Sequence, residues 1–141
     1  MSATHQIARG LRNSNPGNLR HSRAYEWKGE LEPDPDGFCR FDTAHNGLRA
    51  LCRDLQSKGK RGLNTVRKVI EVYAPPNEND TEAYIASVSK ALDVKPDDVL
   101  DLSAVGTVAL FAKAITRHEC GSVPYEVSAI LAAAKDALGV G

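Results

Sequence analysis

The sequence has 141 residues with 18 basic and 18 acidic side chains, so its formal net charge at pH 7 is zero. Hydrophobic residues make up 42% and charged residues 26%, which is typical of one globular domain, and we expect a single domain over residues 1–141. Balanced charge disfavours nucleic-acid binding, because phosphate binding requires a concentrated positive face. No apolar run approaches the roughly 20 residues of a membrane span, so we expect no membrane insertion.

The three cysteines, Cys39, Cys52 and Cys120, lie far apart and form no Cys-x-x-Cys pair. This spacing predicts neither a zinc site nor a disulfide framework, and we expect no metal and no cofactor. Unpaired thiols are typical of a protein made in a reducing cytoplasm. The start, MSATHQIARG, has no apolar stretch of the kind found in signal peptides. A substrate outside the membrane would therefore require another route of delivery.

The first 40 residues are rich in Asn, Gly, Pro and Arg and show no long helical period. Two short extended pieces, residues 18–27 and 38–41, are separated by the Pro-rich turn 32–37. This order predicts a small β-hairpin near the N-terminus.

Helical patterns follow from Asp42 onwards. Cap residues (Asp42 or Thr43, then Asn64 or Thr65, then Asp80) and apolar residues at helical spacing predict the helices. The expected ranges are 43–57, 65–74, 81–92, 103–119 and 124–138, with a short turn at 96–100. The predicted fold class is therefore mainly α, or α+β if the hairpin is counted.

Glu119 is the first candidate for chemistry, in the string AKAITRHECG. It lies where a strongly apolar helix ends before Gly121. Glycosidases use a carboxyl in an apolar setting as their general acid, because desolvation favours the protonated form. The alternative is a surface Glu in a frayed last turn, where the helix dipole is unfavourable to a negative charge.

Asn15 and Asn18 form the second candidate, in the string RNSNPGNLR. Their amides can hydrogen-bond the acetamido and hydroxyl groups of sugars. The alternative is that Asn and Gly serve only the geometry of a tight turn.

The third candidate is the string APPNENDTEAYI, which contains Glu78, Asp80, Thr81 and Tyr84. The two acids are the candidates for a second carboxylate. The alternative is structural, with Asp80 or Thr81 capping a helix and Tyr84 lying in the core.

Two other arrangements are disfavoured. His118 and Cys120 flank Glu119 but do not share a helical face, and no third metal ligand stands nearby. His45 with Cys39 or Cys52 has no motif that supports a catalytic dyad.

The strings RNSNPGNLR, WKG, GFCRFDTAHNGLRAL and GLNTVRKVIEVYAPPNENDTEAYIASVSKALDV resemble a family of small phage-encoded virion or lysis proteins. The resemblance extends over residues 9–125. Members of this family are described as structural proteins or as peptidoglycan hydrolases.

A second resemblance is to flagellar-type glucosaminidases, through Asn15-Pro16-Gly17-Asn18-Leu19, then FCRFDT, then Tyr84. HECGSVPYEVSAI resembles the E-S-G-x-x-P segment of lysozyme-like transglycosylases. In those enzymes the acidic helix comes first, so the order here implies a circular permutation with Glu119 last. Two departures are Cys120, where Ser or Thr is usual, and the form of the Asn segment.

These resemblances imply a lysozyme-like helical domain that cleaves the β-1,4 glycan bonds of bacterial peptidoglycan. Glu119 would be the general acid, and Tyr84 would stabilise the charged intermediate or hold the substrate carbonyl. A hydrolase would also need a second carboxylate, for which Glu78 and Asp80 are the candidates. A lytic transglycosylase would need only one acid. Substrate positioning falls to Asn15, Asn18, Asp80 and Thr81. We therefore expect Asn15 or Asn18 to lie with Tyr84 and Glu119 in one cleft.

The resemblances also imply where the protein acts and with which partners. We expect a monomer that meets peptidoglycan in the periplasm or cell wall, after release during lysis or as part of the virion with other virion proteins. The main rival is a non-enzymatic phage virion or assembly protein that keeps a lysozyme-like fold. A helical nucleic-acid-binding domain is the third reading, and it would require the arginines to form one face.

Overall fold

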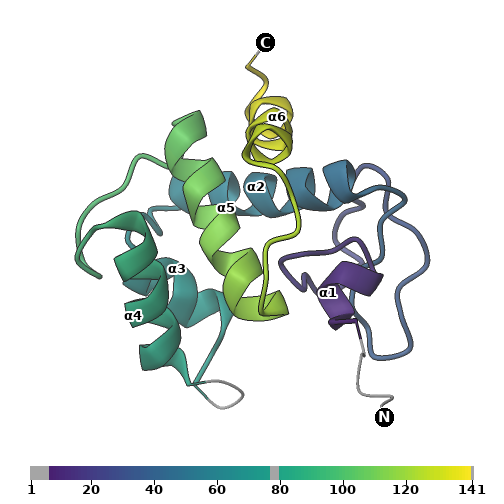
Figure 1. The fold of residues 1–141 in the computed structure, drawn as a ribbon, viewed down its shortest axis with the longest axis horizontal. Coiled ribbons are helices and arrows are strands. Elements are labelled where there is room, and N and C mark those ends of the chain that lie inside the picture. The colour runs from purple at the N-terminus through teal and green to yellow at the C-terminus, as the bar shows by residue number, and fades with distance from the viewer. Residues whose placement is uncertain (1–6, 77–79, 141) are drawn as a thin grey trace.

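A computed structural model describes residues 7–76 and 80–140. Within these ranges the chain forms six helices and no extended strand (Figure 1). The mainly α-helical class predicted from the sequence is thereby confirmed. The helices are α1 (Arg9–Arg12), α2 (Ala44–Lys60), α3 (Val66–Tyr73), α4 (Thr81–Leu92), α5 (Val105–Cys120) and α6 (Val127–Leu138).

Local signals explain where most helices begin and end. The side chain of Thr43 accepts a hydrogen bond from the Asn46 N–H at the start of α2, and Thr65 and Asp80 cap α3 and α4 in the same way. α5 ends at Cys120, because the next residue, Gly121, adopts the left-handed conformation with φ 78°. α5 itself begins at Val105, two residues later than predicted and without a side-chain cap.

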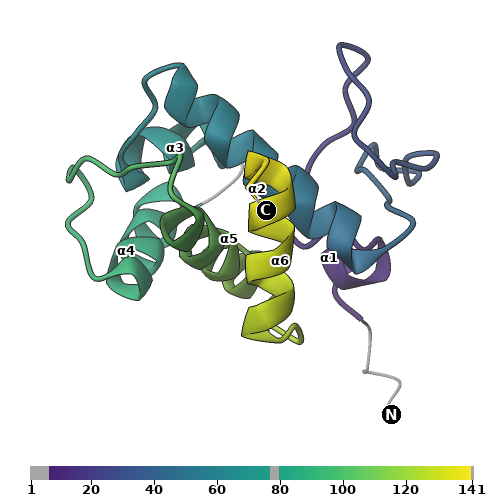
Figure 2. The ribbon, with the colours of Figure 1, turned by 90° about the horizontal axis from the view of Figure 1, so that it is seen from above.

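The core forms where α5 and α6 cross α2, and where α4 packs against α5 and α3 packs against α4 (Figures 1 and 2). Its largest fully buried side chains come from these helices, and they include Leu51, Tyr84, Val108, Phe111 and Ile115. They are the residues at helical spacing on each predicted apolar face. Burial of this apolar surface is the main force that fixes the helix positions.

The small β-hairpin predicted near the N-terminus is not formed. Among the described residues, pairing in this region is limited to two isolated antiparallel bridges, Arg20 with Phe38 and Glu30 with Phe41. The reason is that residues 37–39 bond to residues 19–21, whereas residues 40–42 bond to residues 29–31. Because the extended segment changes partner after three residues, neither pairing extends into a strand.

Residues 13–43 therefore form a series of irregular loops beside the N-terminal part of α2 (Figure 2). They are preceded by the short helix α1, which sequence analysis did not predict because one turn shows no periodicity. α1 lies against α5, whereas the C-terminal end of the chain, beyond α6, lies on the opposite side of the molecule (Figure 1). Along residues 7–76 and 80–140, every helix is too short or too polar to cross a membrane.

Candidate functional site

Glu119 lies in the last turn of α5, half-buried, and both of its carboxylate oxygens accept a hydrogen bond. Asn18 Nδ2 donates to Oε1 at 2.9 Å, and the Tyr84 hydroxyl donates to Oε2 at 2.8 Å. The three residues come from the N-terminal loops, α4 and α5. Two donors on one carboxylate fix its orientation, because each oxygen is held from a different side.

The turn that presents Asn18 is held by the side chain of Asn15. Asn15 is 0% exposed, and its Nδ2 donates to the carbonyls of Leu19 and Cys39, each at 3.0 Å. Its Oδ1 accepts from the Leu19 N–H. Asn18 has φ 50°, a left-handed conformation that Asn tolerates better than most residues. Asn15 therefore shapes the loop, and Asn18 is the asparagine that reaches Glu119.

Tyr84 is 0% exposed, so it contacts Glu119 from inside the protein. Burial raises the pKa of its hydroxyl, and the nearby Tyr73 and Glu119 raise it further. The hydroxyl therefore stays protonated and available as a donor. Its ring stacks on His118 with centroids 3.6 Å apart and an interplanar angle of 20°. The sequence around His118 offers only a disfavoured metal ligand and does not predict this contact.

Two further contacts hold the Pro16–Gly17 turn against the helices. The Tyr73 hydroxyl donates to the Gly17 carbonyl, and Cys120 Sγ donates to the Pro16 carbonyl at 3.4 Å. A Cβ at Gly17 would lie 2.5 Å from the Tyr73 hydroxyl, so the close approach requires glycine. Burial raises the pKa of the Cys120 thiol to about 11, with the charge of Glu119 as the second cause.

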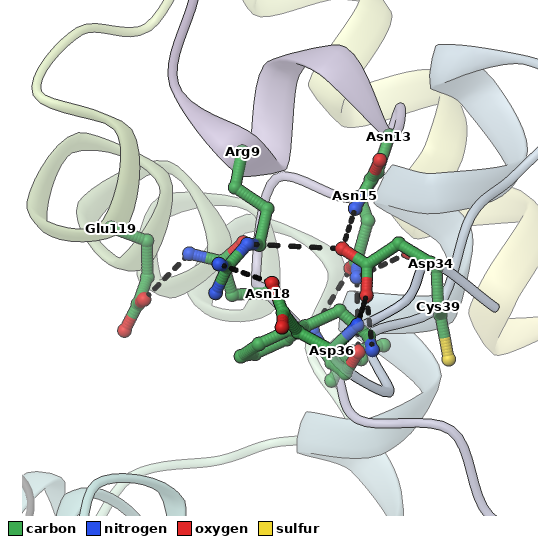
Figure 3. A network of polar contacts seen from close by, with 10 residues as sticks. Arg9, Asn13, Asn15, Asn18, Asp34, Asp36, Cys39 and Glu119 are labelled. Carbon is green, nitrogen blue, oxygen red and sulfur yellow. Dashed lines mark hydrogen bonds and ion pairs between the residues drawn. The ribbon is translucent and has the colours of Figure 1, made fainter.

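A network of hydrogen bonds and ion pairs stabilises the N-terminal loops (Figure 3). Asn13 Nδ2 donates to Asp34 at 3.0 Å, and Arg9 forms ion pairs with Asp34 and Asp36. Hydrogen bonds from the Phe38 N–H and from Asn13 lower the pKa of Asp34. Figure 3 shows that Asn18 and Glu119 lie at one edge of this network.

Two other predicted site residues, Asp80 and Thr81, have structural partners around the start of α4. Asp80 is exposed and caps α4 by accepting from the Ala83 N–H. Thr81 is buried and donates to the Ala74 carbonyl at 2.7 Å, which closes the corner between α3 and α4. Glu78 lies outside the described residues.

A cavity of about 330 Å³ is lined by Asn18, Tyr25, Asp54, Lys58 and Tyr73 among others. Asp54 accepts from Lys58 Nζ at 2.6 Å, one helical turn apart on α2. Burial raises the pKa of Tyr73, and the nearby charges of Glu119 and Asp54 raise it further. Asp54 was not among the predicted site residues, because its only local signal is the i, i+4 pair with Lys58.

Across residues 7–76 and 80–140, no group of three or more His, Cys, Asp or Glu side chains could hold a metal ion. The site that the structure does contain is an oriented carboxylate beside a polar cavity. The protein is thus a small, mainly helical one whose candidate site is centred on Glu119.

Comparison with known protein families finds no match for the chain. The chain is 36% identical over 124 residues to Protein P5 of Pseudoalteromonas phage PM2, an alignment that covers 85% of this chain and 76% of P5. The chain belongs to the family of this phage protein. The phage connection inferred from the sequence is thereby confirmed.

Proposed function

We propose that the protein cleaves the glycan strands of bacterial peptidoglycan with Glu119 as the general acid, in a lysozyme-like arrangement. The observation that carries the proposal is the hydrogen-bonded group of Asn18, Tyr84 and Glu119. Asn18 and Glu119 are 101 positions apart and Tyr84 and Glu119 are 35 apart. A circularly permuted lysozyme-like site requires this meeting of the first and last motifs, and nothing in the local sequence does.

In the proposed reaction, the Glu119 carboxyl donates its proton to the glycosidic oxygen as the bond between that oxygen and C1 breaks. The C6 hydroxyl of the same sugar then attacks C1, and the Glu119 carboxylate accepts the hydroxyl proton. The acid is thereby regenerated and water takes no part. This lytic transglycosylase route needs one carboxyl group, which is what the site around Glu119 contains.

The two hydrogen-bond partners of Glu119 can bind both its carboxylate form and its protonated carboxyl form. An amide side chain carries a donor and an acceptor, so Asn18 can donate to the carboxylate or, turned over, accept from the carboxyl. The Tyr84 hydroxyl has the same double capacity. We assign Tyr84 a positioning role, because it is buried behind Glu119 and contacts the acid itself.

A second candidate function is that of a non-enzymatic virion or assembly protein. It is favoured by the relationship to a phage protein and by the fact that both Glu119 oxygens already accept hydrogen bonds from within the chain. On this reading the three residues only fasten the N-terminal loops to the helices.

The Glu119→Gln variant separates the two functions. Glutamine keeps both contacts, because Asn18 can donate to Oε1 while the Tyr84 hydroxyl turns to accept from Nε2. It cannot supply a proton, so we expect cleavage of purified sacculi to fall about 10²–10⁴-fold while binding is retained. Released muropeptides measure the rate, and circular dichroism checks the fold.

The matched control is Glu71→Gln, an exposed glutamate on α3, which should cleave at the wild-type rate. A folded Glu119→Gln protein with wild-type cleavage would contradict the assignment of the acid. A wild-type protein without cleavage at any pH would favour the assembly role.

A further inference from the structure

A larger hollow of about 850 Å³ lies between α2 and the loop residues 25–30. Its α2 wall carries Arg49, Arg53 and Ser57, and Arg61 follows at the C-cap of that helix. These positions are spaced four apart and extend over ~18 Å. The result is a row of three arginines along one wall of a trough, of which Arg49 and Arg53 also contact Asp136 and the Ala137 carbonyl of α6.

The opposite wall is aromatic. Tyr25 and Trp27 contact each other edge to face, with centroids 4.8 Å apart and an interplanar angle of 83°. The Tyr25 side chain is 51% exposed, which is unusual for a large ring that already has an aromatic neighbour. Lys28, also exposed, adds a positive charge beside them.

This trough adjoins the cavity that Asn18 lines. Tyr25 and Asp54 line both hollows, and Asn18 in the smaller one is hydrogen-bonded to Glu119. A polymer whose reacting bond lies at Glu119 could therefore extend past Tyr25 along the arginine row.

We propose that this trough, called here the Tyr25–Arg61 trough, binds the carboxylate-bearing part of the substrate, a glycan strand substituted with acidic peptides. The proposal rests on the function proposed above. Guanidinium groups bind carboxylates in a two-point geometry, and exposed aromatic rings pack against the apolar faces of sugars. Lys28 and Arg61, both exposed, are the groups placed to take the peptide carboxylates.

The composition of the trough distinguishes this ligand from a nucleic acid. Glu26, Glu30 and Asp54 stand among the cationic residues of the lining. They would repel a continuous chain of phosphates, which prefers an uninterrupted positive groove. A peptidoglycan strand carries carboxylates at intervals, with hydroxyl and amide donors between them. Its carboxylates can bind the basic residues of the lining, and its hydroxyl and amide groups can donate to the acidic ones.

The test uses the Glu119→Gln protein, which should bind without cleaving, and adds Lys28→Gln with Arg61→Gln. Co-sedimentation with intact sacculi should weaken about three- to tenfold, because two charge-assisted contacts are lost. Sacculi stripped of their peptides by an amidase should bind this variant and its parent equally. Tyr25→Ala, by contrast, should weaken binding to both preparations.

The matched control is Lys90→Gln with Lys135→Gln, two exposed lysines on α4 and α6 that remove the same charge elsewhere. Binding of the trough variant equal to this control overturns the inference. So does a loss of single-stranded oligonucleotide binding without a loss of sacculus binding, which would assign the trough to nucleic acid. Circular dichroism of each variant ensures that only folded protein is compared.

The outcomes separate the trough from the catalytic proposal. Weakened binding in the trough variant, together with a wild-type protein that never cleaves, supports the trough and refutes only the enzyme. Unchanged binding, together with normal cleavage by the wild type, refutes only the trough.

Discussion

The helices α2 to α6 are held together by buried apolar side chains, whereas residues 9–42 are held mainly by hydrogen bonds between polar groups. The main core cluster contains no residue before Leu48. The N-terminal loops contribute the buried Leu19, Cys39 and Phe41 and the partly buried Trp27 to a second, small cluster. The hydrogen bonds of two buried polar residues, Asn13 and Asn15, stabilise these loops, as apolar contacts stabilise the helical part.

This difference bears on the candidate site, because Glu119 belongs to the helical part and Asn18 to the loops. Apolar packing is non-directional and tolerates small shifts. Buried hydrogen bonds are directional, and an unpaired buried partner is costly. The position of Asn18 at Glu119 therefore depends on the more exacting of the two kinds of interaction.

The largest expected effect comes from a cavity in the helical part. Leu51→Ala removes a side chain that is 0% exposed in α2, and it should lower the free energy of unfolding by about 2–5 kcal/mol. Leu110→Ala is the control, because Leu110 in α5 is 41% exposed and should cost under about 1 kcal/mol. Urea denaturation measures both, and equal losses would contradict the assigned core.

Asn15→Ala should loosen the loops without unfolding the helices. Three buried main-chain groups, at Leu19 and Cys39, lose their side-chain partner, at a cost of about 2–4 kcal/mol. Hydrogen exchange should become faster in residues 10–20 and 37–42 and stay slow in α4 and α5. Asn46→Ala, which removes one exposed bond to Asp42, is the control and should have little effect. Uniform loss of protection would mean that the two regions unfold together.

Gly47→Ala tests the contact between the two regions. A Cβ at Gly47, in α2, would lie 1.7 Å from the Ser14 carbonyl oxygen, so the loops must move away. We expect a net loss of about 1–3 kcal/mol, although alanine favours the helix by about 1 kcal/mol. Gly106→Ala in α5 is the control, because a Cβ there meets nothing within 4 Å, and stability should rise slightly. Thermal denaturation compares the two, and a stabilised Gly47→Ala protein would contradict the close approach.

The smallest expected effect is a loss of stability at alkaline pH, and it comes from one buried thiol in each region. Burial raises the pKa of both Cys39 and Cys52 from 9.0 to about 12. The folded state thus favours the protonated thiol, and this stability is complete below pH 9 and is lost as the pH rises towards 12. At pH 10 each thiol should account for about 1–2 kcal/mol of lost stability. Cys52→Ala and Cys39→Ala should each flatten the decline of urea midpoints between pH 8 and 10, and an unchanged slope would mean that the thiols titrate normally.

Much of the helical part could be predicted from the sequence because its signals are local. Thr43, Thr65 and Asp80 cap helices at the predicted positions, and the apolar residues that follow them at helical spacing face the core. The N-terminal region could not be predicted in this way. Its extended segment, residues 37–42, pairs with two different stretches of chain, and the choice depends on contacts that no local pattern encodes.

The candidate site, too, has features that the local sequence predicts and features that depend on contacts between distant residues. Sequence alone determined that Glu119 closes an apolar helix and that Asn15 and Asn18 stand in a tight turn, because both follow from neighbouring residues. Only the tertiary structure decided that Asn15 is buried as a clamp, that Asn18 and Tyr84 bond to Glu119, and that Asp54 lies in the adjoining cavity. These residues meet because apolar burial packs α4 against α5 and the buried amide of Asn15 bends the loop towards them, and both interactions act between positions far apart in the chain.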